Sequence, residues 1–153
     1  MIKESVLKYK TNKFLKSNAE KYSVSFNKAK TIGLLFDNDE NYKLSKPFIE
    51  LLSKEGKSVN LLILSHKKEV PTINHYVEKD FNWIGNVTSN KVEQFINKPY
   101  DYLFMLNEEI HYLNKYILAA SKAKCRVGLH NEENEEFFEL MFDNSKKEPI
   151  YKF

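Results

Sequence analysis

The chain has 153 residues, of which 42% are hydrophobic and 29% charged, so it can form one domain with a substantial core but not two ordinary domains. Its longest apolar runs fall far short of the ~20 residues of a transmembrane helix, and its single cysteine excludes an internal disulfide. Because the N-terminus has lysines instead of an uninterrupted apolar stretch, we expect a cytoplasmic protein without a secretory signal.

Charge is distributed unevenly along the chain. The first thirty residues hold eight lysines and two glutamates, a balance of about +6, which leaves about −3 for the rest of a chain of net charge +3. From residue 3 to about residue 21, Val6, Leu7, Phe14 and Leu15 recur at helical spacing without an intervening Pro or Gly. The sequence therefore predicts a basic amphipathic helix. Its candidate partner-binding residues are Lys3, Lys8, Lys10, Lys13, Lys16 and Lys21.

An apolar run over residues 29–36 predicts the first strand, which ends at the acidic residues that begin with Asp37. We accordingly assign residues 1–28 to the basic helix and a connector, and residues 29–153 to an α/β domain.

The remaining predicted elements alternate between strands and helices. Further strands are predicted over residues 59–64, 81–84 (weakly), 100–106, 125–129 and 137–142. Helices are predicted over residues 41–54, with Pro47 in the first turn or at a kink, over 90–96 and around 113–120, whereas 67–79 fits a loop or a short helix.

The strands are apolar throughout, which indicates a sheet covered on both faces, and the intervening helices indicate parallel crossovers. We predict a three-layer α/β fold, Rossmann-like or flavodoxin-like, with a mostly parallel sheet of about five strands. In such sheets ligands bind beyond the carboxyl ends of the strands.

Four segments carry a family resemblance: AKTIGLLFD (29–37), NWIG (82–85), YDYL with LN (100–103 and 106–107) and SKAKCRVG (121–128). They resemble an uncharacterised bacterial family, a domain of unknown function that combines a lysine-rich N-terminal helix with a small α/β body. The resemblance implies a fold and no activity. Leu106-Asn107 and Arg126-Val127-Gly128 are also distantly similar to the N-terminal half of heptosyltransferase-like enzymes, which implies shared architecture only.

Polar residues follow two of the predicted strands and form a candidate ligand site. Asp37 and Asp39 follow the first strand, and Asn107 and Glu108 follow the strand at 100–106. The spacing of the two aspartates resembles that of haloacid-dehalogenase phosphatases, but no later pair of aspartates completes a metal site. Helix capping at the strand-end turns explains the same residues, and it is the interpretation that we favour.

Other chemistry-bearing residues lack a complete motif. The glycines stand singly, so no phosphate-binding loop is present, and the four histidines have no zinc-site spacing. Cys125 has no base beside it in the sequence. We therefore predict no catalytic residue, no metal site and no cofactor.

These observations favour a noncatalytic binding or accessory protein whose lysine-rich helix contacts RNA, a ribonucleoprotein, an acidic protein or an anionic surface. Lysine without arginine argues against sequence-specific base recognition. The alternative is a small-molecule enzyme or sensor that binds a phosphorylated or nucleotide-type ligand at the strand ends. The sequence leaves open whether the helix docks on its own body and whether the protein forms a homo-oligomer.

Overall fold

Six strands form one sheet in the computed structural model, which describes residues 2–17, 24–68 and 71–144. The strands are β1 (Thr31–Phe36), β2 (Ser58–Leu64), β3 (His75–Tyr76), β4 (Tyr102–Met105), β5 (Arg126–Leu129) and β6 (Leu140–Phe142). All neighbouring pairs are parallel, so the predicted α/β fold is confirmed, with six strands in place of about five.

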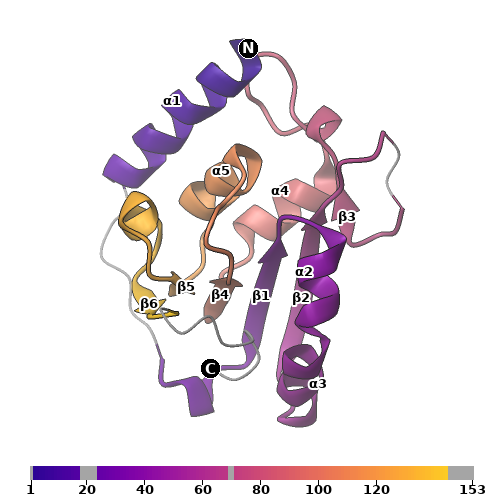
Figure 1. Ribbon diagram of the computed structural model, residues 1–153, viewed down its shortest axis with the longest axis vertical. Helices are drawn as coiled ribbons and strands as arrows, with labels where there is room; N and C mark the ends of the chain where they lie inside the picture. Colours follow the sequence, from indigo (N-terminus) through magenta and orange to yellow (C-terminus); the bar gives the residue numbers. More distant parts are fainter. Residues whose placement is uncertain (1, 18–23, 69–70, 145–153) are drawn as a thin grey trace.

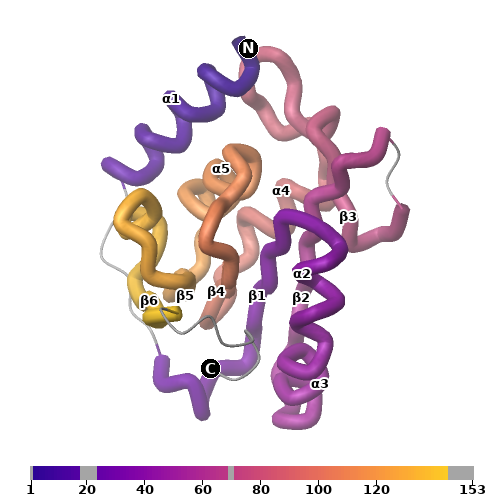
Figure 2. Tube along the Cα trace, in the orientation of Figure 1, coloured from indigo at the N-terminus to yellow at the C-terminus, as the bar shows by residue number. Residues whose placement is uncertain are grey.

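The strand order is β3-β2-β1-β4-β5-β6 (Figure 1). The chain winds outward from β1 to β3, returns to the centre, and winds outward again from β4 to β6 (Figure 2). This is the Rossmann order and not the flavodoxin-like order. The winding direction therefore reverses between β1 and β4, which is where such folds bind ligands.

Helices cover both faces of the sheet. They are α1 (Ile2–Ser17), α2 (Asp39–Leu44), α3 (Lys46–Lys54), α4 (Asn90–Asn97) and α5 (Tyr112–Ala120), with short 3-10 helices η1 (Phe26–Lys28), η2 (Glu78–Asp80) and η3 (Glu132–Phe137). Successive side chains of a strand point to opposite faces. Accordingly, Leu35 belongs to the core beneath α4 and α5, whereas Leu34 belongs to the core beneath α3, together with Leu52.

The N-terminal helix α1 packs against α5 (Figure 1). Leu7 has 0% exposure and belongs to the same core cluster as Leu35 of the central strand. The Phe14 ring meets the Tyr116 ring edge to face, with 5.7 Å between the centroids. The lysine-rich helix is thus docked on the body of the protein, which is one of the arrangements that the sequence leaves open.

The segment after β3 is a tight loop, and the prediction of a strand over residues 81–84 is wrong. Asn82 Oδ1 accepts a hydrogen bond from the backbone N–H of Asn86 at 2.9 Å, and Gly85 has a φ of +73°. An asparagine side chain that accepts from backbone N–H groups further along the chain, together with a glycine at positive φ, turns the chain back on itself. The third strand is instead the two-residue β3, which is too short to produce a sequence pattern.

Two further elements differ from their predicted bounds. The predicted helix over residues 41–54 is divided into α2 and α3 at Ser45, and Pro47 lies in the first turn of α3, where its missing N–H breaks no helical bond. The predicted last strand over residues 137–142 is shorter, because Phe137 belongs to η3.

Candidate functional site at the carboxyl ends of the strands

Asp37 lies directly after β1, beside the point where the winding of the sheet reverses. Asn114 Nδ2 donates to Asp37 Oδ1 at 2.6 Å and to the Phe36 carbonyl oxygen at 3.1 Å. The backbone N–H of His111 donates to Asp37 Oδ2 at 3.1 Å. Since His111 and Asn114 lie at the start of the helix that follows β4, one carboxylate joins the two central strands at their carboxyl ends.

Burial shifts both titratable groups of this cluster toward their neutral forms. It raises the pKa of the Asp37 carboxyl above the ordinary 3.8, although hydrogen bonds from Asn114 and His111 oppose the rise. Burial also lowers the pKa of the His111 imidazole below the ordinary 6.5. His111 Nδ1 caps α5 by accepting from the Leu113 N–H at 3.2 Å. The neutral imidazole therefore carries its proton on Nε2.

His66, which follows β2, faces His111. Its Nε2 lies 3.0 Å from the carbonyl oxygen of Asp37, and because a carbonyl only accepts, His66 Nε2 is the donor. The two imidazole rings meet edge to face at 5.7 Å between centroids. The end of β1, the end of β2 and the start of α5 thus bring two histidines together over Asp37.

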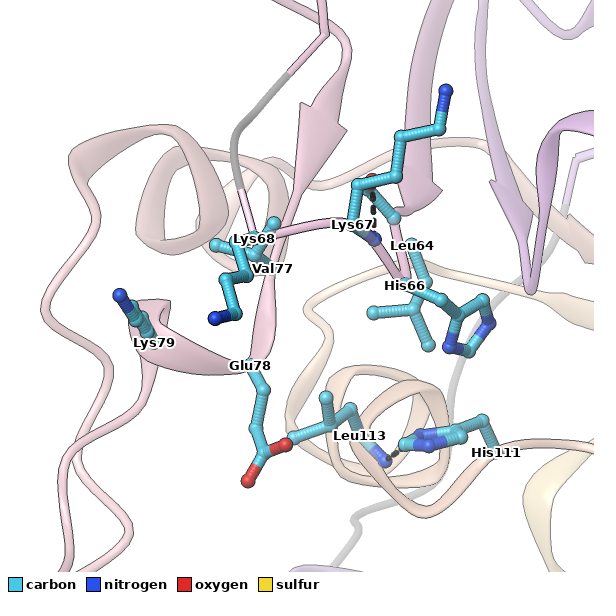
Figure 3. A pocket seen from close by; sticks show the side chains of 10 residues that line it. Leu64, His66, Lys67, Lys68, Val77, Glu78, Lys79, His111 and Leu113 are labelled. Atoms are coloured by element: carbon cyan, nitrogen blue, oxygen red, sulfur yellow. Dashed lines mark hydrogen bonds between the residues drawn. The ribbon is translucent and has the colours of Figure 1, made fainter.

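A pocket of about 240 Å³ opens beside the two histidines. It is lined by Leu64, Ser65, His66, Lys67, Lys68, Val77, Glu78, Lys79, His111 and Leu113. Figure 3 shows Lys68 and Lys79 across the pocket from the histidines, whereas the ammonium of Lys67 extends away from them. Among the described residues, the lining has three lysines against one carboxylate, which favours a positive potential in the pocket.

The N-terminal helix borders this pocket. Lys3 Nζ donates to the carbonyl oxygen of Glu78 at 2.9 Å and lies 3.9 Å from its Oε1, so it offsets the negative charge of Glu78. Lys10 Nζ donates to the Gly85 carbonyl oxygen at 3.2 Å and to Asn86 Oδ1 at 2.8 Å. These two lysines, predicted to contact an external partner, therefore hold the helix to the loops after β3.

The other predicted lysines are placed differently. Lys8 forms an ion pair with Glu4 at 2.9 Å along the helix surface. Lys13 and Lys16 are exposed. Lys21 lies outside the described residues.

Asp39 begins α2 and turns away from Asp37. Its Oδ1 lies 2.5 Å from His75 Nε2, and His75 Nδ1 lies 2.6 Å from Thr72 Oγ1. The hydrogen bond from His75 lowers the pKa of the Asp39 carboxyl. This chain of contacts fastens the edge strand β3 to α2. The two aspartates therefore face different partners and do not converge as those of a phosphatase do.

Asn107 and Glu108 follow β4, as predicted. The Glu108 carbonyl oxygen accepts hydrogen bonds from Asn131 Nδ2 and Asn134 Nδ2, each at 3.0 Å. Within the described part of the chain, no hydrogen bond or ion pair joins the Asn107 or Glu108 side chain to Asp37. Of the four predicted ligand residues, Asp37 is thus the one that contacts the lining of the pocket.

Sequence reasoning missed His66, His111 and Asn114. The available signal was positional: His66 comes two residues after β2 and His111 directly precedes α5. Across residues 2–17, 24–68 and 71–144, no group of three or more His, Cys, Asp or Glu side chains is placed to hold a metal ion. The helices of these same segments include none long and apolar enough to cross a membrane.

The strand order and the cationic pocket define an α/β protein of Rossmann topology with a candidate anion site at the strand ends. Residues 3–153 match the Family of unknown function (DUF6913), and the chain belongs to this family. No curated protein and no solved structure matches it.

Proposed function

We propose that the protein binds a small phosphorylated compound in the pocket beside His66 and His111, as a ligand-binding or sensor protein. The observation that carries the proposal is the gathering of lysine side chains around a pocket at the carboxyl ends of β2 and β3 and the start of α5. Ligands of Rossmann folds bind at this end of the sheet, next to the point of reversal.

Several groups favour an anion over a cation or a neutral molecule. Lys68 and Lys79 supply positive charge on one side, and the imidazoles supply N–H donors on the other. The pocket also lies at the start of α5, where the helix dipole favours negative charge. At about 240 Å³ the pocket accommodates a phosphoryl group and a small attachment, and its open side leaves room for a larger remainder outside.

The arrangement of the lining favours binding over catalysis. Ser65, the one hydroxyl in the lining, accepts a hydrogen bond from the Lys67 N–H at 3.2 Å and is buried. Asp37 is already held by two donors. A nucleophile hydrogen-bonded to an oriented base is the usual sign of covalent catalysis, and the contacts of the lining residues include none in the described chain.

Thermal unfolding with and without ligand tests the proposal. Inorganic phosphate and a panel of sugar phosphates and nucleoside monophosphates serve as probes. A ligand at one hundred times its Kd adds about 2.7 kcal/mol of stability, which raises the Tm by roughly 5–10 °C for a chain of this size. His66→Asn and Lys68→Gln should abolish the rise.

Lys54→Gln is the matched control, because Lys54 is an exposed lysine at the end of α3 and does not line the pocket. A Tm that no phosphorylated probe raises counts against the proposal. So does a rise that persists in both pocket variants.

The second candidate function is docking of an acidic macromolecule on the outer face of α1. Lys8, Lys13 and Lys16 favour it, since all three are exposed on that helix. Lysines that neutralise phosphates make binding strongly salt-dependent. The triple variant Lys8→Gln, Lys13→Gln and Lys16→Gln should therefore lower the affinity for mixed single-stranded RNA and flatten its salt dependence. Equal RNA binding by the variant and the parent protein would exclude this role.

A further inference from the structure

The outer edge of β2 is only partly covered. β1 pairs with β2 over residues 58–63, but on the other side β3 pairs with Ile63 and Leu64 alone. In the described chain, residues 58–62 therefore have no strand along their outer edge. An edge of this kind presents backbone groups that can pair with another chain.

The direction of the backbone groups follows from the hydrogen bonds at the two ends of β2. Ser58 N–H donates to the Lys30 carbonyl oxygen at 2.8 Å, toward β1, whereas Ile63 N–H donates outward to the Asn74 carbonyl oxygen at 2.8 Å. The N–H and C=O of one residue in a parallel strand point to the same side, and the side alternates along the strand. Val59 and Leu61 consequently direct their N–H and C=O groups outward, and no described strand forms hydrogen bonds with these groups.

A groove of about 670 Å³ runs beside this open edge. Leu62 and Phe95 form its buried floor, at 1% and 5% exposure, and Ile73, at 82% exposure, supplies accessible apolar surface. Asn60 faces the same side and donates to Tyr100 Oη at 3.4 Å. The groove therefore offers a backbone edge together with a pocket for alternate side chains, which are the two parts of a strand-addition site.

The positive charges at the groove favour an acidic binding partner. Lys91 and Lys98 line it, and the described residues of its lining include no carboxylate. Lys91 Nζ donates to the carbonyl oxygen of His75, and Lys98 Nζ lies 5.5 Å from the centre of the Tyr100 ring, so both ammonium groups are held at the groove. A second copy of this chain would bring the same lysines together and be repelled, whereas an acidic peptide is complementary.

We propose that the outer edge of β2 binds an extended acidic segment of another protein as an added strand. The peptide backbone pairs with Val59 and Leu61, its apolar side chains contact Ile73, and its carboxylates meet Lys91 and Lys98. The site lies at the amino-terminal half of β2 and is separate from the pocket beside His66.

Fluorescence anisotropy with a labelled hexapeptide of alternating glutamate and valine tests the proposal. Val59→Pro removes one outward N–H and leaves the bonds to β1 in place, so it should weaken binding about tenfold, the effect of one lost net hydrogen bond. Val59→Thr keeps the N–H and is the matched control. The double variant Lys91→Gln and Lys98→Gln should weaken binding and reduce its salt dependence, whereas Lys54→Gln should not.

A second set of measurements leaves the protein unchanged. N-methylation of alternate peptide residues removes backbone donors and should abolish binding, and replacement of glutamate by lysine should do the same. In amide exchange, the Val59 and Leu61 N–H groups should become protected when the acidic peptide is added. Absence of binding at millimolar peptide, equal binding of the N-methylated peptide, or a dimer of the protein that Val59→Pro dissociates would each overturn the proposal.

Discussion

Truncation of Leu7 tests whether the N-terminal helix belongs to the folded core. Leu7 has 0% exposure and lies in the cluster beneath α4 and α5. Replacement of a buried leucine by alanine costs about 2–5 kcal/mol, through lost burial and the cavity left behind. With an m-value of about 2 kcal/mol per molar urea, a loss of about 3 kcal/mol lowers the unfolding midpoint of Leu7→Ala by roughly 1.5 M.

The matched control is Tyr9→Ala, on the same helix at 68% exposure, which should change the free energy of unfolding by less than ~0.5 kcal/mol. Far-ultraviolet circular dichroism in urea measures both variants. A single transition that moves only for Leu7→Ala is the expected result. Equal midpoints for the two variants, or a separate early transition of the helix, would show that α1 is an independent appendage.

Three further outcomes are expected. Gly85→Ala should destabilise more than Gly56→Ala, by roughly 1–3 kcal/mol: both glycines have positive φ, but an added Cβ would lie 3.0 Å from Val6 at Gly85 and meet nothing within 4 Å at Gly56. Equal losses in urea unfolding would refute this packing. Burial raises the pKa of Asp101, but hydrogen-bond donors that include the Lys30 N–H outweigh burial and lower this pKa to about 2. Asp101→Asn should therefore reduce the free energy of unfolding by ~1.5–3 kcal/mol at pH 7. That difference should vanish as the pH falls from about 4 to about 2, and a constant difference would contradict it. Affinity for sulfate, a phosphate analogue whose charge does not change in this range, should rise by calorimetry as the pH falls through the lowered pKa of His111, because protonation adds positive charge to the pocket. His111→Asn, which retains a capping side chain, should weaken this dependence. An unchanged pH dependence in His111→Asn would remove this histidine from the site.

The order of strands and helices could be predicted because each long strand is an apolar run bounded by polar residues. The runs at 29–36, 59–64, 100–106 and 125–129 all became strands of the sheet. The two-residue β3 could not be predicted, since two residues show no alternation. The choice between Rossmann and flavodoxin-like order also depends on long-range pairing, which one sequence does not reveal.

The position of Asp37 at a strand end could be predicted, but its surroundings could not. His66 and Asn114 lie 29 and 77 residues from Asp37 along the chain, and only the parallel pairing of β1 with both neighbours brings them together. The charge of the first helix also did not predict which of its lysines contact the body of the protein. The sequence does not distinguish among the lysines of this helix. In the structure, Lys3 and Lys10 donate to backbone carbonyl oxygens of the segment after β3, whereas Lys13 and Lys16 are exposed. The packing of Leu7 into the core orients the helix, and this orientation decides which lysines face the body and which face solvent.

Titration of the isotope-labelled protein with inorganic phosphate, followed by two-dimensional NMR of backbone amides and imidazoles, shows whether the pocket beside His66 and His111 binds an anion. The cationic strand-end pocket predicts saturable shifts confined to residues 64–68, 77–79 and 111–113, including the His66 and His111 rings. Shifts confined to the exposed lysines of α1, or no saturable shift at all, would contradict it.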